Sequence, residues 1–209
     1  DGSGIRIAAD MGLKVSPLSP ALVKVRTDDV NSASIAGVRA KGRIRIDTPY
    51  EEDIEDYGEI QFTRDGLSGI PVFNISRYIS IIAKSKKPVT AHIDLMPESS
   101  AEQIVSILRL KREKYISDAD SKAHTAEELM TGLVHKKLSA YILKRTGVKP
   151  GKPACDINDQ DIKNYASTLK DLIFNITGTY GFEEAQVTCG GVDISEIDEH
   201  MECVRIPGL

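Results

Sequence analysis

A strict alternation of apolar and polar residues marks the clearest strand of the sequence, at residues 38–47. The apolar positions hold Val38, Ala40, Ile44 and Ile46, and most of the intervening positions hold Arg or Lys. Successive side chains of a strand point to opposite faces, so this pattern places one face on a core and the other in water. Shorter strands are predicted at residues 22–25, 59–63 and 89–95, and the runs at 38–47 and 59–63 are predicted to pair as a hairpin with a long loop.

Helical spacing dominates the second half of the chain. Short and medium helices are predicted at residues 3–11 and 71–84, and from Ser99 to Thr177 the apolar period is that of three helices. Their starts are marked by capping boxes. In such a box, the side chain of the capping residue accepts a hydrogen bond from the backbone N–H three residues later, and the side chain at that later position accepts one from the backbone N–H of the capping residue. These starts are Ser99 with Glu102 or Ser100 with Gln103, then Thr125 with Glu128, then Asn158 with Asp161. The second helix is predicted to end at Gly147, and the third to run through Ile176 and stop at Gly178.

These elements predict an α+β fold made of two subdomains. Residues 1–98 and 178–209 form a discontinuous β-rich subdomain, and residues 99–177 form a helical subdomain of three helices inserted into it. A last strand, at residues 182–188, is expected to rejoin the earlier sheet.

Composition excludes several classes of protein. The 209 residues include 41% hydrophobic and 28% charged residues, which is ordinary for a globular chain. No apolar run approaches the roughly 18 residues that a membrane span needs. The formal net charge of −4 argues against a dedicated nucleic-acid binder. Three cysteines without C-x-x-C spacing and four scattered histidines predict neither disulfides nor a metal site, and favour a cytoplasmic protein.

A cationic row lies on the polar face of the 38–47 strand, at Arg39, Lys41, Arg43 and Arg45. It allows the hypothesis of a free-standing binding module for an acidic or nucleic-acid partner. The simpler interpretation is a solvated face balanced by the acidic residues at 51–56, and it is favoured here.

Two glycine clusters are candidate ligand sites. Gly66, Leu67, Ser68 and Gly69 lie between a strand and a helix, and Thr188-Cys189-Gly190-Gly191-Val192 follows the last strand. Glycine permits positive φ and a close approach of backbone to a ligand, although such clusters are more often turns. Cys189 would be a nucleophile only with a base nearby, so a thiol hydrolase is a weaker third hypothesis.

The two clusters also carry a family resemblance. The run Phe62-Thr63-Arg64-Asp65-Gly66-Leu67-Ser68-Gly69 resembles the F-T-x-x-G-[IL]-S-G motif of the aminoacetone oxidase-like (YhiN-like) NAD(P)/FAD-dependent flavoproteins. The run Gln186 to Val192, with Pro207-Gly208-Leu209 further on, resembles the same family's second motif.

The resemblance implies a β-barrel-like part carrying a helical part, inserted into an FAD-dependent oxidoreductase of about twice this length. It implies cofactor contacts at Gly66, Leu67, Ser68, Gly69, Thr188, Gly190, Gly191 and Val192, and leaves the catalytic residues and the choice of NADH, NADPH or oxygen open. The chain begins without Met at Asp1 and lacks a dinucleotide fingerprint. We therefore expect an inactive fragment that retains no FAD by itself. Its expected partners are the FAD-binding remainder of the chain and a small-molecule substrate, with no nucleic acid and no membrane.

Overall fold

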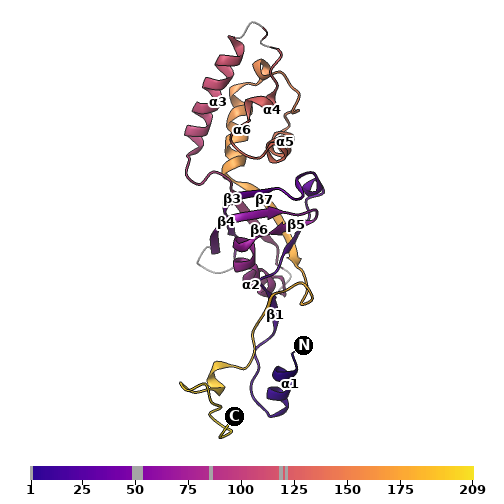
Figure 1. The fold of residues 1–209 in the computed structure, drawn as a ribbon, viewed down its shortest axis with the longest axis vertical. Coiled ribbons are helices and arrows are strands. Elements are labelled where there is room, and N and C mark those ends of the chain that lie inside the picture. Colours follow the sequence, from indigo (N-terminus) through magenta and orange to yellow (C-terminus); the bar gives the residue numbers. More distant parts are fainter. Residues whose placement is uncertain (1, 49–53, 85–86, 118–119, 121) are drawn as a thin grey trace.

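The chain folds into an elongated molecule with three successive parts. The computed structural model describes residues 2–48, 54–84, 87–117, 120 and 122–209. Helices form one end and a β-barrel lies in the middle. A narrow neck, made of residues 19–21 and 187–189, leads to a small foot, made of residues 2–18 and 190–209, at the end that holds both termini (Figure 1).

The barrel has six strands, which close in the order β2-β5-β4-β3-β6-β7 through antiparallel pairs. They are β2 (Val25–Thr27), β3 (Arg39–Ile46), β4 (Ile54–Phe62), β5 (Gly66–Ser68), β6 (Val89–Asp94) and β7 (Leu172–Thr179). The α+β fold, the alternating strand at 38–47 and its hairpin partner are thereby confirmed, with Arg39 opposite Gln61 and Ile46 opposite Ile54.

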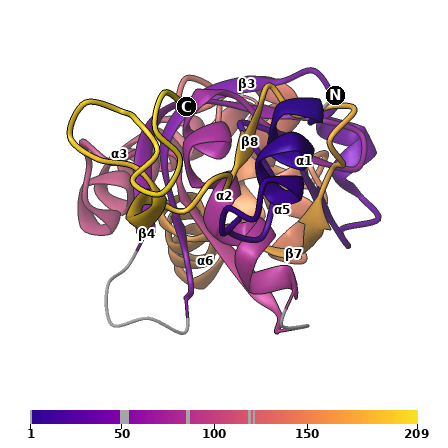
Figure 2. The same cartoon turned by 90° about the horizontal axis from the view of Figure 1, so that it is seen from below.

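Helix α2 (Ile70–Lys84) closes the end of the barrel nearer the neck (Figure 2). Its buried face includes Val72, Ile75, Ile79 and Ile82, which join the barrel core. Its other face carries Phe73, Asn74 and Arg77, which are half-buried or exposed. The helix predicted at 71–84 is confirmed. One of its faces packs in the barrel core, and the other is accessible to solvent.

Among the described residues, four α-helices lie between β6 and β7, which is one more than predicted. They are α3 (Ala101–Ile116), α4 (Ala126–Leu129), α5 (Lys136–Arg145) and α6 (Asp159–Lys170). Capping boxes at Ser100, Thr125 and Asn158 are confirmed. The second predicted helix is wrong as one element, because α4 ends at Leu129 and Gly132 takes a left-handed φ of 93° before α5 begins.

The third predicted helix is wrong beyond Lys170. Residues Leu172–Thr179 form strand β7, in which Leu172, Phe174 and Ile176 are buried and the residues between them are exposed. The apolar side chains at 169, 172, 173 and 176 fit helical spacing, but β-branched and aromatic residues in a period of two fit a strand better. Residues 172–177 therefore lie in the barrel, while the wider division into two subdomains remains a prediction.

The neck is a two-stranded sheet separate from the barrel. Strand β1 (Ser19–Ala21) pairs antiparallel with β8 (Val187–Cys189), and Ser19 lies opposite Cys189. The last predicted strand thus does not rejoin the barrel sheet, because its partner is the short segment before β2. Below the neck lie α1 (Ser3–Asp10), as predicted, and the C-terminal segment with the short 3-10 helix Ile194–Glu196.

The foot is held together by contacts between its two segments. Val15 bridges Val192, and Lys14 forms an ion pair with Asp193 at 3.1 Å. Hydrogen bonds from Ser195, together with Lys14, lower the pKa of the Asp193 carboxyl to about 2. The carboxylate is therefore charged at neutral pH.

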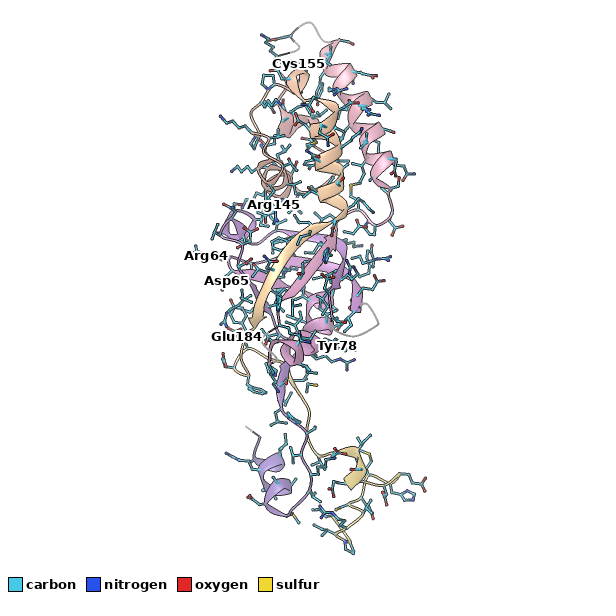
Figure 3. All side chains as sticks on the ribbon, turned by 180° about the vertical axis from the view of Figure 1, so that it is seen from behind. Arg64, Asp65, Tyr78, Arg145, Cys155 and Glu184 are labelled. Atoms are coloured by element: carbon cyan, nitrogen blue, oxygen red, sulfur yellow. The ribbon has the colours of Figure 1, made fainter. Side chains whose placement is uncertain are left out.

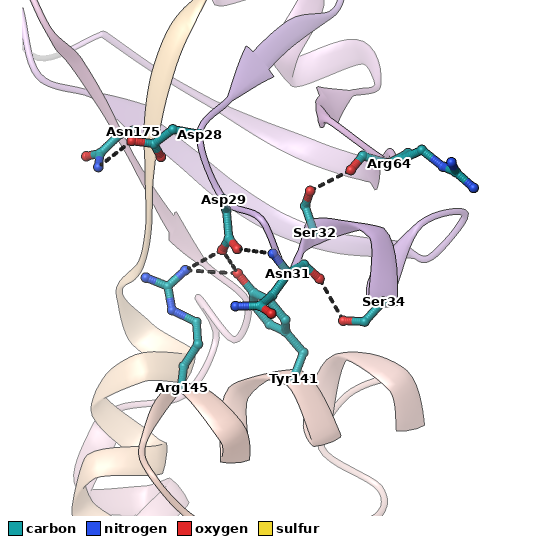
Figure 4. A network of polar contacts seen from close by, with 9 residues as sticks. All are labelled: Asp28, Asp29, Asn31, Ser32, Ser34, Arg64, Tyr141, Arg145 and Asn175. Carbon is teal, nitrogen blue, oxygen red and sulfur yellow. Dashed lines mark hydrogen bonds and ion pairs between the residues drawn. The ribbon is translucent and has the colours of Figure 1, made fainter.

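A polar network ties the loop after β2 to α5 (Figure 4). Tyr141 donates its hydroxyl hydrogen to the Asp29 carboxylate, and Arg145 Nη1 lies 3.1 Å from the same Asp29 oxygen. Burial and the hydrogen bond to Asp29 both raise the pKa of Tyr141 above its ordinary value. The network connects the barrel to the helical end of the molecule.

Helices of membrane-spanning length and apolarity do not occur in the described part of the chain.

Candidate functional site: the cleft beside the neck

The first predicted glycine cluster lies inside the barrel wall. Gly66, Leu67 and Ser68 form strand β5 and are buried, and Gly69 is half-buried at the start of α2. A Cβ at Gly66 would lie 1.9 Å from the Val25 carbonyl oxygen, and one at Gly69 would lie 2.3 Å from the Glu59 carbonyl oxygen. Both glycines are thus needed where backbones meet closely. Their assignment as cofactor contacts remains a prediction.

The second predicted cluster lies at the neck and the top of the foot. Thr188 and Gly190 are exposed, and Gly191 and Val192 are half-buried. Gly190 has φ 94° and approaches the Pro17 carbonyl closely, whereas the Cβ direction of Gly191 meets no atom within 4 Å. The Ser16 hydroxyl bonds both the Gly191 N–H and its carbonyl. Val192 bridges Val15, so much of the backbone of this segment is bonded within the chain, but Thr188 and Gly190 are exposed and this cluster is the more accessible of the two.

A cleft of about 470 Å³ lies between α2 and the neck. Its lining comes from three segments: Ala21 and Leu22 at the end of β1, Phe73, Asn74 and Arg77 on α2, and Val187, Thr188 and Cys189 on β8. Tyr78, the neighbour of Arg77, is labelled in Figure 3 at this end of the barrel, where the neck begins. The cleft therefore brings one predicted site residue, Thr188, together with α2.

Buried serines of α2 fix β1 and the residues that follow it against the barrel and so set the shape of the cleft. The Ser76 hydroxyl accepts a hydrogen bond from the Val23 N–H at 3.3 Å. The Ser80 hydroxyl donates to the Pro20 carbonyl at 2.7 Å and lies 3.1 Å from the Thr179 hydroxyl. Because side chains that are themselves hydrogen-bonded in the core hold the cleft walls, the site is preorganised.

Two residues of the cleft have features that favour ligand binding. Leu22 has φ 50°, a left-handed conformation that costs a non-glycine residue about 1 kcal/mol. Such strain often occurs at ligand sites. Arg77 is exposed, and its guanidinium contacts the ring and hydroxyl of Tyr78. Among the described residues, it forms no ion pair with a carboxylate.

Sequence reasoning did not identify this cleft. The sequence predicted a helix at 71–84 without a role in a cleft, although a spacing of four residues places Phe73 and Arg77 on one face. That face is opposite the buried stripe of Val72, Ile75 and Ile79, so an aromatic residue and a cation at this spacing were the available signal. The approach of the neck to α2, which depends on the β1–β8 pair, left no signal in the sequence.

Comparison with known families decides the identity of the domain. Residues 19–187 match the family described as "HI0933-like protein barrel and H2TH domain". The chain belongs to this family. The matched range starts at β1 and ends at Val187, the first residue of β8, so it contains the barrel, the inserted helices and β1, and it leaves out the foot.

Curated relatives of this HI0933-like chain are enzymes by name. It is 33% identical over 198 residues to a 3-dehydro-bile acid delta(4,6)-reductase of Clostridium scindens, covering 94% of this chain and 47% of the relative. It is 29% identical over 216 residues to a ribosomal RNA dihydrouridine synthase of Escherichia coli, covering 99% of this chain and 48% of the relative. A synthase of the same name from Haemophilus influenzae is 25% identical over 209 residues, covering 99% of this chain and 47% of the relative. The chain thus spans about half the length of the curated relatives it matches.

The cationic row of this HI0933-like domain is largely paired. Arg39 forms an ion pair with Glu59 at 3.1 Å, Arg43 with Glu55 at 3.4 Å, and Arg45 with Asp47 at 2.9 Å. Carboxylates on β4 and after β3 therefore neutralise much of the field that a polyanion would need. The interpretation as a balanced, solvated strand face is the better one, although of the acidic residues predicted at 51–56 only Glu55 is among these partners and residues 51–53 lie outside the described residues.

Cys189 lines the cleft as a free thiol. Within the described ranges, its sulfur has no hydrogen bond to a histidine or a carboxylate that could activate it. The same ranges contain no cluster of three or more His, Cys, Asp or Glu residues that could hold a metal ion.

Proposed function

We propose that this chain is the substrate-side domain of an FAD-dependent oxidoreductase, and that the remainder of a longer protein holds most of the FAD. The observation that carries the proposal is the position of the cleft. It opens at the neck, where the HI0933-like domain ends and the foot begins. A ligand there would lie between the barrel and whatever packs on the foot.

The foot supports a partner domain at this place. Helix α1 is amphipathic, yet none of its residues is buried. Ile7 on α1 is 58% exposed and Met201 in the C-terminal segment is 78% exposed. Exposed apolar side chains gathered at one end of a molecule favour an interface, and the relatives are about twice as long as this chain. We propose the missing half as the partner.

The flavin contacts that this domain would supply are in the second cluster. Thr188 lines the cleft, and Gly190, Gly191 and Val192 follow it along the chain into the foot. A flavin bound there would supply the redox chemistry. The barrel and α2 would exclude water from the reacting side. The first cluster would contribute to the flavin site indirectly, because it forms the barrel wall on which α2 packs. Its residues are Gly66, Leu67, Ser68 and Gly69.

A small molecule is the proposed substrate class. The relatives' names include a bile acid and a ribosomal RNA as substrates. The paired cationic row and the net charge of −4 favour the small molecule for this chain.

The proposal predicts that the chain alone does not retain FAD. The chain is incubated with excess FAD and desalted, and its absorbance near 450 nm is compared with that at 280 nm. We expect no flavin band and no oxidoreductase activity, because the second cluster supplies one side of the site. Flavin retained in about a one-to-one ratio would contradict the proposal.

A further inference from the structure

The half-buried thiol of Cys189 lines the cleft beside the neck. Strand β8 places it opposite Ser19 of β1, and residues opposite one another in an antiparallel pair have their side chains on the same face. Ala21, two residues after Ser19, shares that face of β1 and lines the cleft. The side chains of Ser19 and Cys189 therefore lie together on the cleft side of the neck.

The Ser19 hydroxyl has no hydrogen-bond partner among the described residues, although Ser19 is only 1% exposed. Buried hydroxyl groups are normally bonded, and an unbonded one is unfavourable. Side chains opposite one another across two antiparallel strands have Cβ atoms about 4.5–5.5 Å apart. An oxygen atom bound to the Cys189 sulfur can therefore reach the Ser19 hydroxyl and supply the acceptor that this hydroxyl lacks.

The charge of the cleft lining distinguishes Cys189 from the other half-buried thiol. Arg77 lines the cleft, no acidic residue among the described ones does so, and the Arg77 guanidinium contacts Tyr78 in place of a carboxylate. Cys155, which Figure 3 labels at the helical end, has its sulfur 3.8 Å from the Asp156 carboxylate. The two thiols are similarly buried, but one lies beside a carboxylate and the other shares a cleft with a cation.

We propose that Cys189 is a site of oxidation, at which hydrogen peroxide converts the thiolate into a sulfenic acid. The sulfur attacks one peroxide oxygen, the S–O bond forms as the O–O bond breaks, and hydroxide leaves, so that sulfur is oxidised and peroxide is reduced. Arg77 stabilises the negative charge that develops on the leaving oxygen, and Ser19 donates a hydrogen bond to the oxygen bound to sulfur. A separate base is not required, because the thiolate is itself the nucleophile.

The test is site-resolved oxidation of the chain itself. The chain is exposed to hydrogen peroxide, sulfenic acid is trapped with dimedone, and labelling of the three cysteines is measured by peptide mass spectrometry. We expect Cys189 to be labelled at least about tenfold faster than Cys155, and the buried Cys203 to be labelled least. The inference goes beyond the proposed function and does not depend on it, because no flavin takes part in the experiment.

Variants separate the roles of the two neighbours. Ser19→Ala should leave the rate of thiol loss at Cys189 unchanged and shorten the lifetime of its sulfenic acid about tenfold, because the hydrogen-bond donor is gone. Arg77→Gln should slow the oxidation itself about tenfold, and Arg77→Lys should recover part of the loss.

A matched control excludes a general effect of charge. Arg64 is an exposed arginine in the loop between β4 and β5, so Arg64→Gln removes the same charge elsewhere and should leave the oxidation rate unchanged. Thermal unfolding confirms that each variant is folded. Labelling of Cys155 as fast as that of Cys189 would overturn the inference, and so would equal lifetimes of the sulfenic acid in wild type and Ser19→Ala.

Discussion

Gly66→Ala should prevent the barrel from closing. Its Cβ would lie 1.9 Å from the Val25 carbonyl oxygen and 3.0 Å from the Arg26 Cα, and these are backbone atoms of the neighbouring strand β2. Since backbone in a closed barrel cannot move as a side chain does, the clash separates β2 from β5. We expect the free energy of unfolding to fall by at least about 3 kcal/mol, which is a large part of a typical domain's stability. Denaturant titration followed by circular dichroism measures it.

The matched control is Gly151→Ala. Gly151 has open space in its Cβ direction and an ordinary backbone conformation, so the change should alter the free energy of unfolding by no more than about 0.5 kcal/mol. A Gly66→Ala protein that is as stable as wild type would contradict the packing role of this glycine. It would return the first cluster to consideration as an exposed ligand loop.

Asp29→Ala should destabilise the chain by about 2 kcal/mol. The change removes the acceptor of the Tyr141 hydroxyl, which is 2% exposed as a residue, and the ion-pair partner of Arg145. A buried donor that loses its acceptor keeps its full desolvation penalty. We expect this loss in chemical denaturation at neutral pH, together with faster amide exchange in α5.

Two further variants test whether the network causes the effect. Asp28→Ala removes the neighbouring carboxylate, which contacts the exposed Asn175 side chain at 3.2 Å, and should cost no more than about 0.5 kcal/mol. In the Asp29→Ala background, Tyr141→Phe should cost much less than in wild type, because both changes remove the same hydrogen bond. Additive effects of the two changes would show that the network does not couple the barrel to α5.

The local pattern of residues predicts much of the barrel. Strand β3 alternates strictly between Ala40, Ile44 and Ile46 on one side and cations on the other, and its period of two has no helical alternative. Helix α2 and the capping boxes at Ser100, Thr125 and Asn158 have equally local signals. Such elements are specified by neighbours in sequence, so a single chain suffices to predict them.

Elements that depend on distant contacts were predicted less well. Leu172 and Ile176 fit both a helical and a strand period, and the pairing of this segment with β2 and β6 makes it a strand. The β1–β8 pair joins segments that are far apart in sequence, and it brings Thr188 to α2. The cleft therefore follows from tertiary structure, although the spacing of Phe73 and Arg77 in the sequence already places them on one face of α2.

The neck makes the most direct test of the central claim possible. Ser19 lies opposite Cys189, so Leu18 and Gly190 are close enough to be joined by a turn of about three residues. In the longer protein that we propose, residues 19–189 are replaced by such a turn, and the flavin absorbance of the purified variant is measured beside that of the full protein. We predict that the variant keeps FAD in about a one-to-one ratio and loses substrate turnover. A folded variant that holds no FAD, with this chain retaining the flavin instead, would contradict the account.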